Sequence, residues 1–250
     1  MENNKNEIYF KQEEDISDEK INEIKKFVNE IYESSKLSDE VIESLNEHNK
    51  TILKYTKELA TEESLSQEDL ENVQLAAILH DAAKTNSSLL KHGFASSKIA
   101  QQKLLEMGFK NERVKIITNA IERHMGPIPG FMQREAKKHT DKTGEEVIFS
   151  RPETMVDKIL YDADMLSLVD KNGINKILIL RKSIDMFINE DKQEANEKNI
   201  SQEKVAYLSA LKSAEEAINS LYTEAARKKG DVLIKEARDL SLSNFDENHP

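Results

Sequence analysis

The stretch Leu75–Lys84, which reads LAAILHDAAK, carries more information than any other part of this sequence. Five small or apolar residues lead directly into His80 and Asp81, and two alanines and Lys84 follow. A run of this kind without glycine or proline predicts a buried helix. Ionised carboxylates are almost never buried unless they are paired or metal-bound. We therefore expect a histidine, a carboxylate and a lysine to enter the protein core at one helix end.

A second stretch, Ile159–Leu166 (ILYDADML), also places an acid, Asp164, among apolar residues. Asp162 lies two residues earlier, and acids at this spacing usually mark a solvated helix edge or a turn. The chain has only six histidines: His48, His80, His92, His124, His139 and His249. His48 and His124 fall on the apolar faces of predicted helices, where a lone histidine is more often an ordinary core residue. Several such groups on separate buried helices nevertheless indicate one shared polar site, which is how helical bundles bind metals.

The spacing of apolar residues predicts helices over most of the chain, and no strand alternation is convincing. The predicted helices cover about 18–34, 38–59, 67–81, 93–108, 114–124, 152–166, 174–188, 205–225 and 232–240. The polar segments 126–151 and 189–199 are expected to be irregular. Gly230 is expected to interrupt the last long helix, and residues 241–250 are expected to be frayed.

The composition agrees with a helical protein and excludes several classes of function. Glycine (7) and proline (4) are scarce among the 250 residues, which argues against a turn-rich β fold. Without cysteine there is no disulfide framework, thiolate nucleophile or zinc ribbon. The formal charge of −11 argues against long nucleic acids and anionic membranes as partners. No apolar run could span a bilayer and no signal peptide is present, so we expect a cytoplasmic protein.

We expect an all-α fold in three parts. Residues 1–37 form an N-terminal helical extension, residues 38–182 form a metal-binding core, and residues 183–250 form a C-terminal helical extension packed on the core. The long predicted helix between 201 and 240 either covers this core or mediates a homodimer.

The order and spacing of the polar residues resemble the H…HD…D signature of the HD-domain superfamily of metal-dependent phosphohydrolases. His48, His80-Asp81 and Asp164 match this signature, and the resemblance covers about residues 40–170. It implies an HD-domain helical bundle. The glycine- and proline-rich segment that follows HD in the cyclic di-GMP branch is not found here, which argues against that substrate.

His92 and His124 extend this resemblance to the dinuclear H…HD…H…H…D branch of the superfamily. This branch includes dinucleoside tetraphosphate hydrolases and cyclic-dinucleotide phosphodiesterases. The resemblance implies one ion held by His48, His80, Asp81 and Asp164, and a second ion held by His92 and His124, with Asp81 bridging the two. Imidazole and carboxylate ligands suit transition metals better than magnesium. We therefore expect two divalent or mixed-valent transition-metal ions, iron or manganese before zinc, cobalt or nickel, and no other cofactor.

Two ions about 3.5–4 Å apart can share a hydroxide and hold a phosphoryl group between them. The predicted reaction is therefore hydrolysis of a phosphate ester or anhydride in a small nucleotide-like or otherwise phosphorylated metabolite. Lys84 follows Asp81 by three residues and is expected to contact a phosphate oxygen, so Asp81 and Lys84 are the predicted catalytic residues.

Two other functions remain open from the sequence. A di-iron oxygenase of the same fold would use the same ligands, and a non-catalytic nucleotide-binding regulator would keep the fold without the reaction. Lys91 and Arg123 are either ordinary surface charges or part of a basic rim. The segment 126–151 either overhangs the pocket and selects the substrate or is a surface loop. His139 and His249 are not expected to be ligands.

Overall fold

The computed structural model describes residues 16–88, 90–126, 131–170, 173–175, 178 and 185–246. Its helices are α1 (Asp18–Glu33), α2 (Asp39–Glu62), α3 (Gln67–Leu79), α4 (His92–Glu106), α5 (Asn111–Arg123), α6 (Phe131–Thr143), α7 (Met155–Val169), α9 (Asp185–Lys198), α10 (Gln202–Asn219) and α11 (Glu224–Asp246). No strand occurs among the described residues, so the all-α prediction is confirmed.

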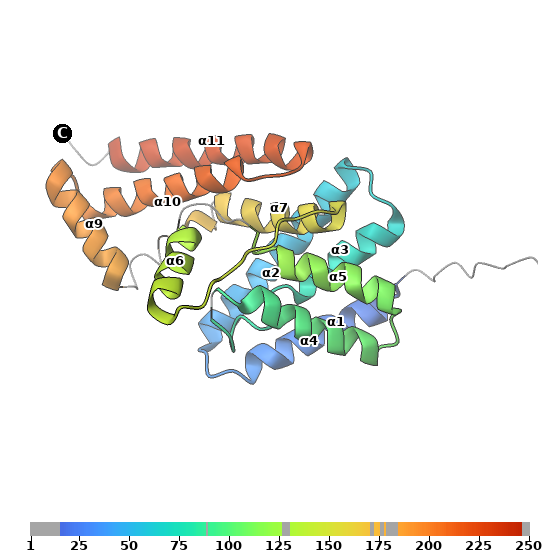
Figure 1. Cartoon of the computed structure of the whole chain (residues 1–250). Helices are drawn as coiled ribbons and strands as arrows, with labels where there is room; N and C mark the ends of the chain where they lie inside the picture. Colours follow the sequence, from blue (N-terminus) through green and yellow to red (C-terminus); the bar gives the residue numbers. More distant parts are fainter. Residues whose placement is uncertain are drawn as a thin grey trace, which may run out of the picture.

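Helix α3 is the central element of the bundle because its second half is apolar on every side. All residues from Leu75 to Leu79 are buried. Helices α1, α2, α5 and α7 pack around α3, and α4 packs on α5. Helices α10 and α11 run side by side along α7, at the top of the view in Figure 1. The predicted buried helix leading into His80 is therefore confirmed.

Capping side chains set several helix starts. Ser17 and Ser66 cap α1 and α3 by accepting hydrogen bonds from backbone N–H groups. Helix α7 begins three residues later than a start at Pro152, because Thr154 and Asp157 form a reciprocal capping box. The predicted start of this helix at about residue 152 is therefore three residues too early.

Two polar segments that the sequence predicts to be irregular are helical. Helix α6 occupies residues 131–143 of the segment 126–151, and α9 covers most of the predicted break at 189–199. Neither helix has a continuous apolar stripe, so periodicity misses both. Both are rich in glutamate, lysine, glutamine and alanine, which have high helix propensity. Residues 127–130 and much of the predicted helix 174–188 lie outside the described residues.

The C-terminal helices also break at a different place. Helix α10 ends at Asn219 and α11 begins at Glu224, so the predicted helix 205–225 is in fact two helices. Gly230 lies inside α11 and interrupts nothing. Helix α11 continues to Asp246, so the predicted fraying is wrong for residues 241–246.

The corner between α10 and α11 is held by a buried carboxylate on α7. Asp162 accepts hydrogen bonds of 2.8 Å from the backbone N–H groups of Tyr222 and Thr223, and one of 2.7 Å from the Thr223 hydroxyl. Burial raises the pKa of Asp162 to about 6 although these hydrogen bonds oppose the rise. Asp162 therefore has a structural role that joins the C-terminal helices to the core.

Replacing Asp162 by alanine is expected to lower the free energy of unfolding by about 2–4 kcal/mol, because three donors lose their acceptor. Asp162→Asn keeps one acceptor oxygen and is expected to cost less. Urea unfolding followed by circular dichroism measures both. Equal losses in the two variants, or no loss in either, would contradict this role.

Helix α1 belongs to the same hydrophobic core as the central helices, since it buries Ile24, Val28 and Tyr32. The proposed boundaries after residues 37 and 182 stay predictions. None of the described helices combines the length and the apolar character needed to cross a membrane.

Candidate metal centre

Five helices bring the six predicted ligand residues together. His48 lies within α2, His80 caps the end of α3, His92 is the first residue of α4, His124 caps the end of α5, and Asp164 lies within α7. Asp81 directly follows His80. All are buried except Asp164, whose side chain is 14% exposed. The structure therefore brings the six residues together, and their role as metal ligands stays a prediction.

A glycine allows two of these helix ends to approach each other. Gly93 follows His92, and a Cβ atom at this position would lie 2.7 Å from the Met125 side chain and 3.3 Å from the His124 ring. Any larger residue would have to displace these neighbours. The Nε2 atoms of His92 and His124 lie 3.2 Å apart as a result of this close packing.

Asp81 is the centre of the cluster, and its two carboxylate oxygens face different histidines. Oδ2 lies 3.4 Å from His48 Nε2 and 3.3 Å from His80 Nε2. Oδ1 lies 3.1 Å from His92 Nε2 and 3.9 Å from His124 Nε2. The carboxylate thus separates the histidines into two pairs, which is the arrangement that a bridging ligand requires.

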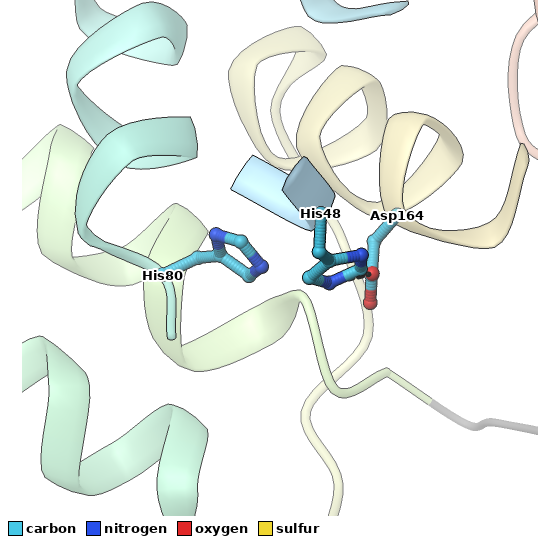
Figure 2. A group of neighbouring side chains, drawn as sticks. All are labelled: His48, His80 and Asp164. Carbon is cyan, nitrogen blue, oxygen red and sulfur yellow. Dashed lines mark ion pairs between the residues drawn. The ribbon is translucent and has the colours of Figure 1, made fainter. Parts of the chain in front are cut away.

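Asp164 completes the side of the cluster that contains His48. Its Oδ1 lies 3.5 Å from His48 Nε2, and Figure 2 shows His48 and Asp164 next to each other with the His80 ring facing them. In each of two groups, one of His48, His80 and Asp164 and the other of His80, Asp81 and His124, the potential ligand atoms lie within 4.8 Å of one another.

Backbone carbonyl groups orient two of the rings. Nδ1 of His80 donates to Ala77 O at 2.8 Å, and Nδ1 of His124 donates to Ile121 O at 2.5 Å. Both histidines cap a helix, so the carbonyl three residues earlier lies within reach. In the neutral form of each ring, these bonds leave Nε2 directed at the cluster as an acceptor, the form that binds metal.

The cluster environment changes the protonation of its members. Burial lowers the pKa of His48 and lowers that of His124 to about 3, where neighbouring His80 and His92 add to the effect. Burial alone would lower the pKa of His80, but the Asp81 carboxylate raises it. Burial also opposes ionisation of Asp81, but His80 and Lys84 hold its pKa well below the usual value. The cluster therefore contains an ionised Asp81 carboxylate and neutral imidazoles at His48 and His124, whereas Asp81 favours a proton on His80 that a bound metal would displace.

Several buried polar atoms in the cluster are suited to metal binding. His48 Nε2, His80 Nε2 and Asp81 Oδ1 are shielded from solvent and make no hydrogen bond among the described residues. Buried polar atoms are normally hydrogen-bonded, and leaving them unpaired costs about 1–3 kcal/mol each. A transition-metal ion would satisfy all three, because imidazole nitrogen and carboxylate oxygen are its usual ligands.

Lys84 lies at the cluster but is already paired. Its Nζ donates to Asp81 Oδ2 at 2.5 Å. Burial would lower the pKa of Lys84, but the carboxylates of Asp81 and Asp164 raise it. The lysine is therefore charged and stands next to the proposed ligands, where the sequence predicts it.

The hydroxyl of Tyr32 supports the backbone of the HD dipeptide, and sequence reasoning missed this residue. Tyr32 on α1 donates to Asp81 O at 3.3 Å and accepts a 3.2 Å hydrogen bond from Asn49 Nδ2 on α2. The only signal in the sequence is its place on the apolar stripe of α1, four residues after Val28. A stripe position predicts burial but does not reveal a hydroxyl contact to Asp81.

Replacing Tyr32 by phenylalanine is expected to lower the free energy of unfolding by about 1–3 kcal/mol, because Asp81 O and Asn49 Nδ2 lose their partner. Denaturant unfolding of the metal-free protein measures this loss. Tyr222→Phe is a matched control, since the Tyr222 hydroxyl makes no hydrogen bond among the described residues. An equal loss in both variants would show that the hydroxyl of Tyr32 has no special role.

Other polar residues near the ligands have structural partners. Arg123 pairs with Asp157 at 2.8 Å and Glu153 at 3.0 Å and so supports the start of α7. Lys91 pairs with Glu145 at 2.7 Å. His139, which is not a predicted ligand, has its Nε2 atom 3.5 Å from Oε2 of the same Glu145. Asp162 serves the α10–α11 corner, and His249 lies outside the described residues.

Comparison with known proteins bears on the family and the fold of this chain. Residues 45–168 match the family model of the HD domain. Among solved structures, the chain is similar to a predicted HD superfamily hydrolase from an uncultured Thermotogales bacterium, with a TM-score of 0.57. The two share 18% sequence identity, over 91% of this chain and 92% of that chain. A search of curated proteins found no match.

Proposed function

This chain belongs to the HD-domain superfamily, and we propose that it is a metal-dependent phosphohydrolase. Its substrate would be a phosphate ester or anhydride in a small nucleotide-like or otherwise phosphorylated metabolite. The observation that carries the proposal is the buried Asp81 carboxylate, whose two oxygens face separate histidine pairs. The description of the similar Thermotogales protein as a hydrolase supports the same type of reaction.

We assign two ions to the cluster. His48, His80, Asp81 and Asp164 would hold the first ion, and Asp81, His92 and His124 would hold the second. The potential ligand atoms of His80, Asp81 and His124 also lie within 4.8 Å of one another, although we assign His80 to the first ion and His124 to the second. The assignment of His80 to the first ion therefore rests on its 3.3 Å distance to Asp81 Oδ2. When bound, the two ions would supply an activated water molecule and neutralise the charge of the phosphate.

The side chains of the protein have separate parts in this reaction. Asp81 holds the two halves of the site at a fixed separation, because its carboxylate is buried and its backbone is anchored by Tyr32. Lys84 carries a positive charge at the edge of the cluster, and 32% of its side chain is exposed. It is the residue that we expect to contact a phosphate oxygen and to stabilise negative charge in the transition state.

We also propose that the segment after α6 helps to select the substrate. Residues 145–150 line a cavity of about 290 Å³ together with Lys91, Phe94 and Met125. Lys91 and Met125 are the chain neighbours of His92 and His124. Phe94, Met125 and Phe149 give this cavity an apolar part that suits the organic part of a phosphorylated metabolite. Glu122, Glu145 and Glu146 also line it, so the phosphate itself would lie outside the cavity.

The test is a metal analysis combined with a substrate screen of the full chain loaded with manganese or iron. The screen includes p-nitrophenyl phosphate, bis-p-nitrophenyl phosphate, nucleotides and dinucleoside polyphosphates. We expect hydrolysis that a chelator abolishes and that proceeds equally without oxygen. Activity that requires both iron and oxygen would favour the oxygenase, and protein that binds no metal would refute both enzymes.

A further inference from the structure

A second cavity lies between α1 and α2, apart from the metal cluster. It measures about 320 Å³ and is lined by Lys25, Val28, Asn29, Asn46, Asn49, Lys50, Leu53 and Ile78. We call these residues the α1/α2 groove. Its volume is at the lower end of the range for small-molecule sites in proteins. No function described so far uses it.

The charge of the groove is opposite to that of the whole chain. The protein carries a formal charge of −11, yet the groove is lined by two lysines and by no acidic residue. Three asparagine side chains add amide donors and acceptors, and Val28, Leu53 and Ile78 provide apolar contact. Lysine and amide N–H groups together are donors that suit an anionic oxygen ligand such as a phosphate.

One acceptor in the groove is also without a partner. Asn49 Nδ2 donates to Tyr32, whereas Asn49 Oδ1 is buried and accepts no hydrogen bond among the described residues. A ligand with a hydroxyl or amino group could satisfy this oxygen after a small movement of the side chain, which is common on binding. The ligand would therefore combine a phosphate with at least one such donor.

Among the described residues, the ion pair that competes for a lysine of the groove is weak. Lys50 Nζ lies 2.6 Å from Glu47 Oε1, and both side chains are more than half exposed, at 72% and 58%. Exposed pairs of this kind contribute little because solvent screens them. A bound phosphate could therefore replace Glu47 as the partner of Lys50.

We propose that the α1/α2 groove is a binding site for a phosphorylated sugar, either free or as part of a nucleotide. Lys25 and Lys50 contact the phosphate, and the amides of Asn46 and Asn49 bind the hydroxyl-bearing part. The site is separate from the metal centre, although Asn49 and Tyr32 link it to the backbone of Asp81. This proposal does not depend on the proposed hydrolysis.

The test measures binding to the full chain after removal of metal with a chelator, so that the metal centre makes no contribution. The probes are ribose 5-phosphate, AMP and adenosine, with calorimetry for affinity and amide NMR shifts for location. We expect saturable binding of at least one phosphorylated probe, shifts in α1 and α2, and much weaker binding of adenosine. Equal affinities for ribose 5-phosphate and AMP would identify the sugar phosphate as sufficient, whereas tighter AMP binding would identify the nucleotide.

Matched lysine variants test the location independently. Lys25→Gln is expected to weaken binding about fivefold, as the loss of one charged contact at an exposed lysine predicts. Lys26→Gln removes the same charge from the same helix, but Lys26 is 78% exposed and lies outside the groove. It is expected to change affinity by less than about twofold. The proposal is overturned if neither phosphorylated probe binds saturably, if both variants weaken binding equally, or if the shifts map to α4 and α5.

Discussion

Replacing Asp81 by alanine is expected to abolish both metal binding and hydrolysis while the helical circular dichroism signal remains largely intact. Asp81 faces four histidine Nε2 atoms through its two oxygens, at 3.1–3.9 Å, so no other residue can take its place between the two halves of the cluster. Loss of residues that merely orient metal ligands typically costs about 10–100-fold. Loss of a ligand shared by both ions should cost more, and we expect a rate reduction of more than about 100-fold.

A second buried acid provides a control for the loss of a carboxylate from the core. Asp162→Asn changes the charge of a fully buried aspartate on α7, but its partners are at the α10–α11 corner. It is expected to lower stability and to leave metal content and rate nearly unchanged. Metal content after dialysis and the rate with the best substrate of the screen are measured for both variants. Full activity of Asp81→Ala would refute the assignment.

The sequence predicts a polar site at His80 and Asp81 because it places a charged residue in a segment that must be buried. The apolar run before His80 indicates that Asp81 is buried, and a buried carboxylate needs a partner. Asp164 is recognised by the same logic, whereas His48, His92 and His124 are assigned as ligands by the resemblance to the HD-domain signature. What this reasoning cannot supply is the distance between helices, which packing in three dimensions determines.

The errors in the fold have two physical causes. Helices α6 and α9 were missed because they lack an apolar stripe, so intrinsic propensity and not burial explains their helical state. The corner between α10 and α11 was missed because the residue that stabilises it is distant in the sequence. Asp162 lies 60 residues before Tyr222, and no local pattern reports that contact. The contact of Tyr32 with Asp81, over 49 residues, was missed for the same reason.

Replacing His124 by alanine is expected to reduce the bound metal from two ions to one. His124 and His92 are the two histidines on the side of Asp81 Oδ1, and their Nε2 atoms lie 3.2 Å apart. Without His124, the second ion would keep only His92 and a shared carboxylate. The first ion would keep His48, His80, Asp81 and Asp164. Hydrolysis should fall more than about 100-fold, because a single ion cannot hold the phosphoryl group from both sides.

Elemental analysis of the dialysed protein counts the ions, and electron paramagnetic resonance of the manganese form reports whether two of them are magnetically coupled. His139→Ala is the matched control, because His139 is partly exposed and its ion pair is with Glu145, outside the cluster. It should keep both ions and the coupled signal. His48→Ala should instead weaken the first ion, since His48 lies on the side of Asp81 Oδ2 and Asp164. Two coupled ions retained in His124→Ala would refute the assignment of His124 as a ligand of the second ion, because an ion held by His124 would be lost with it.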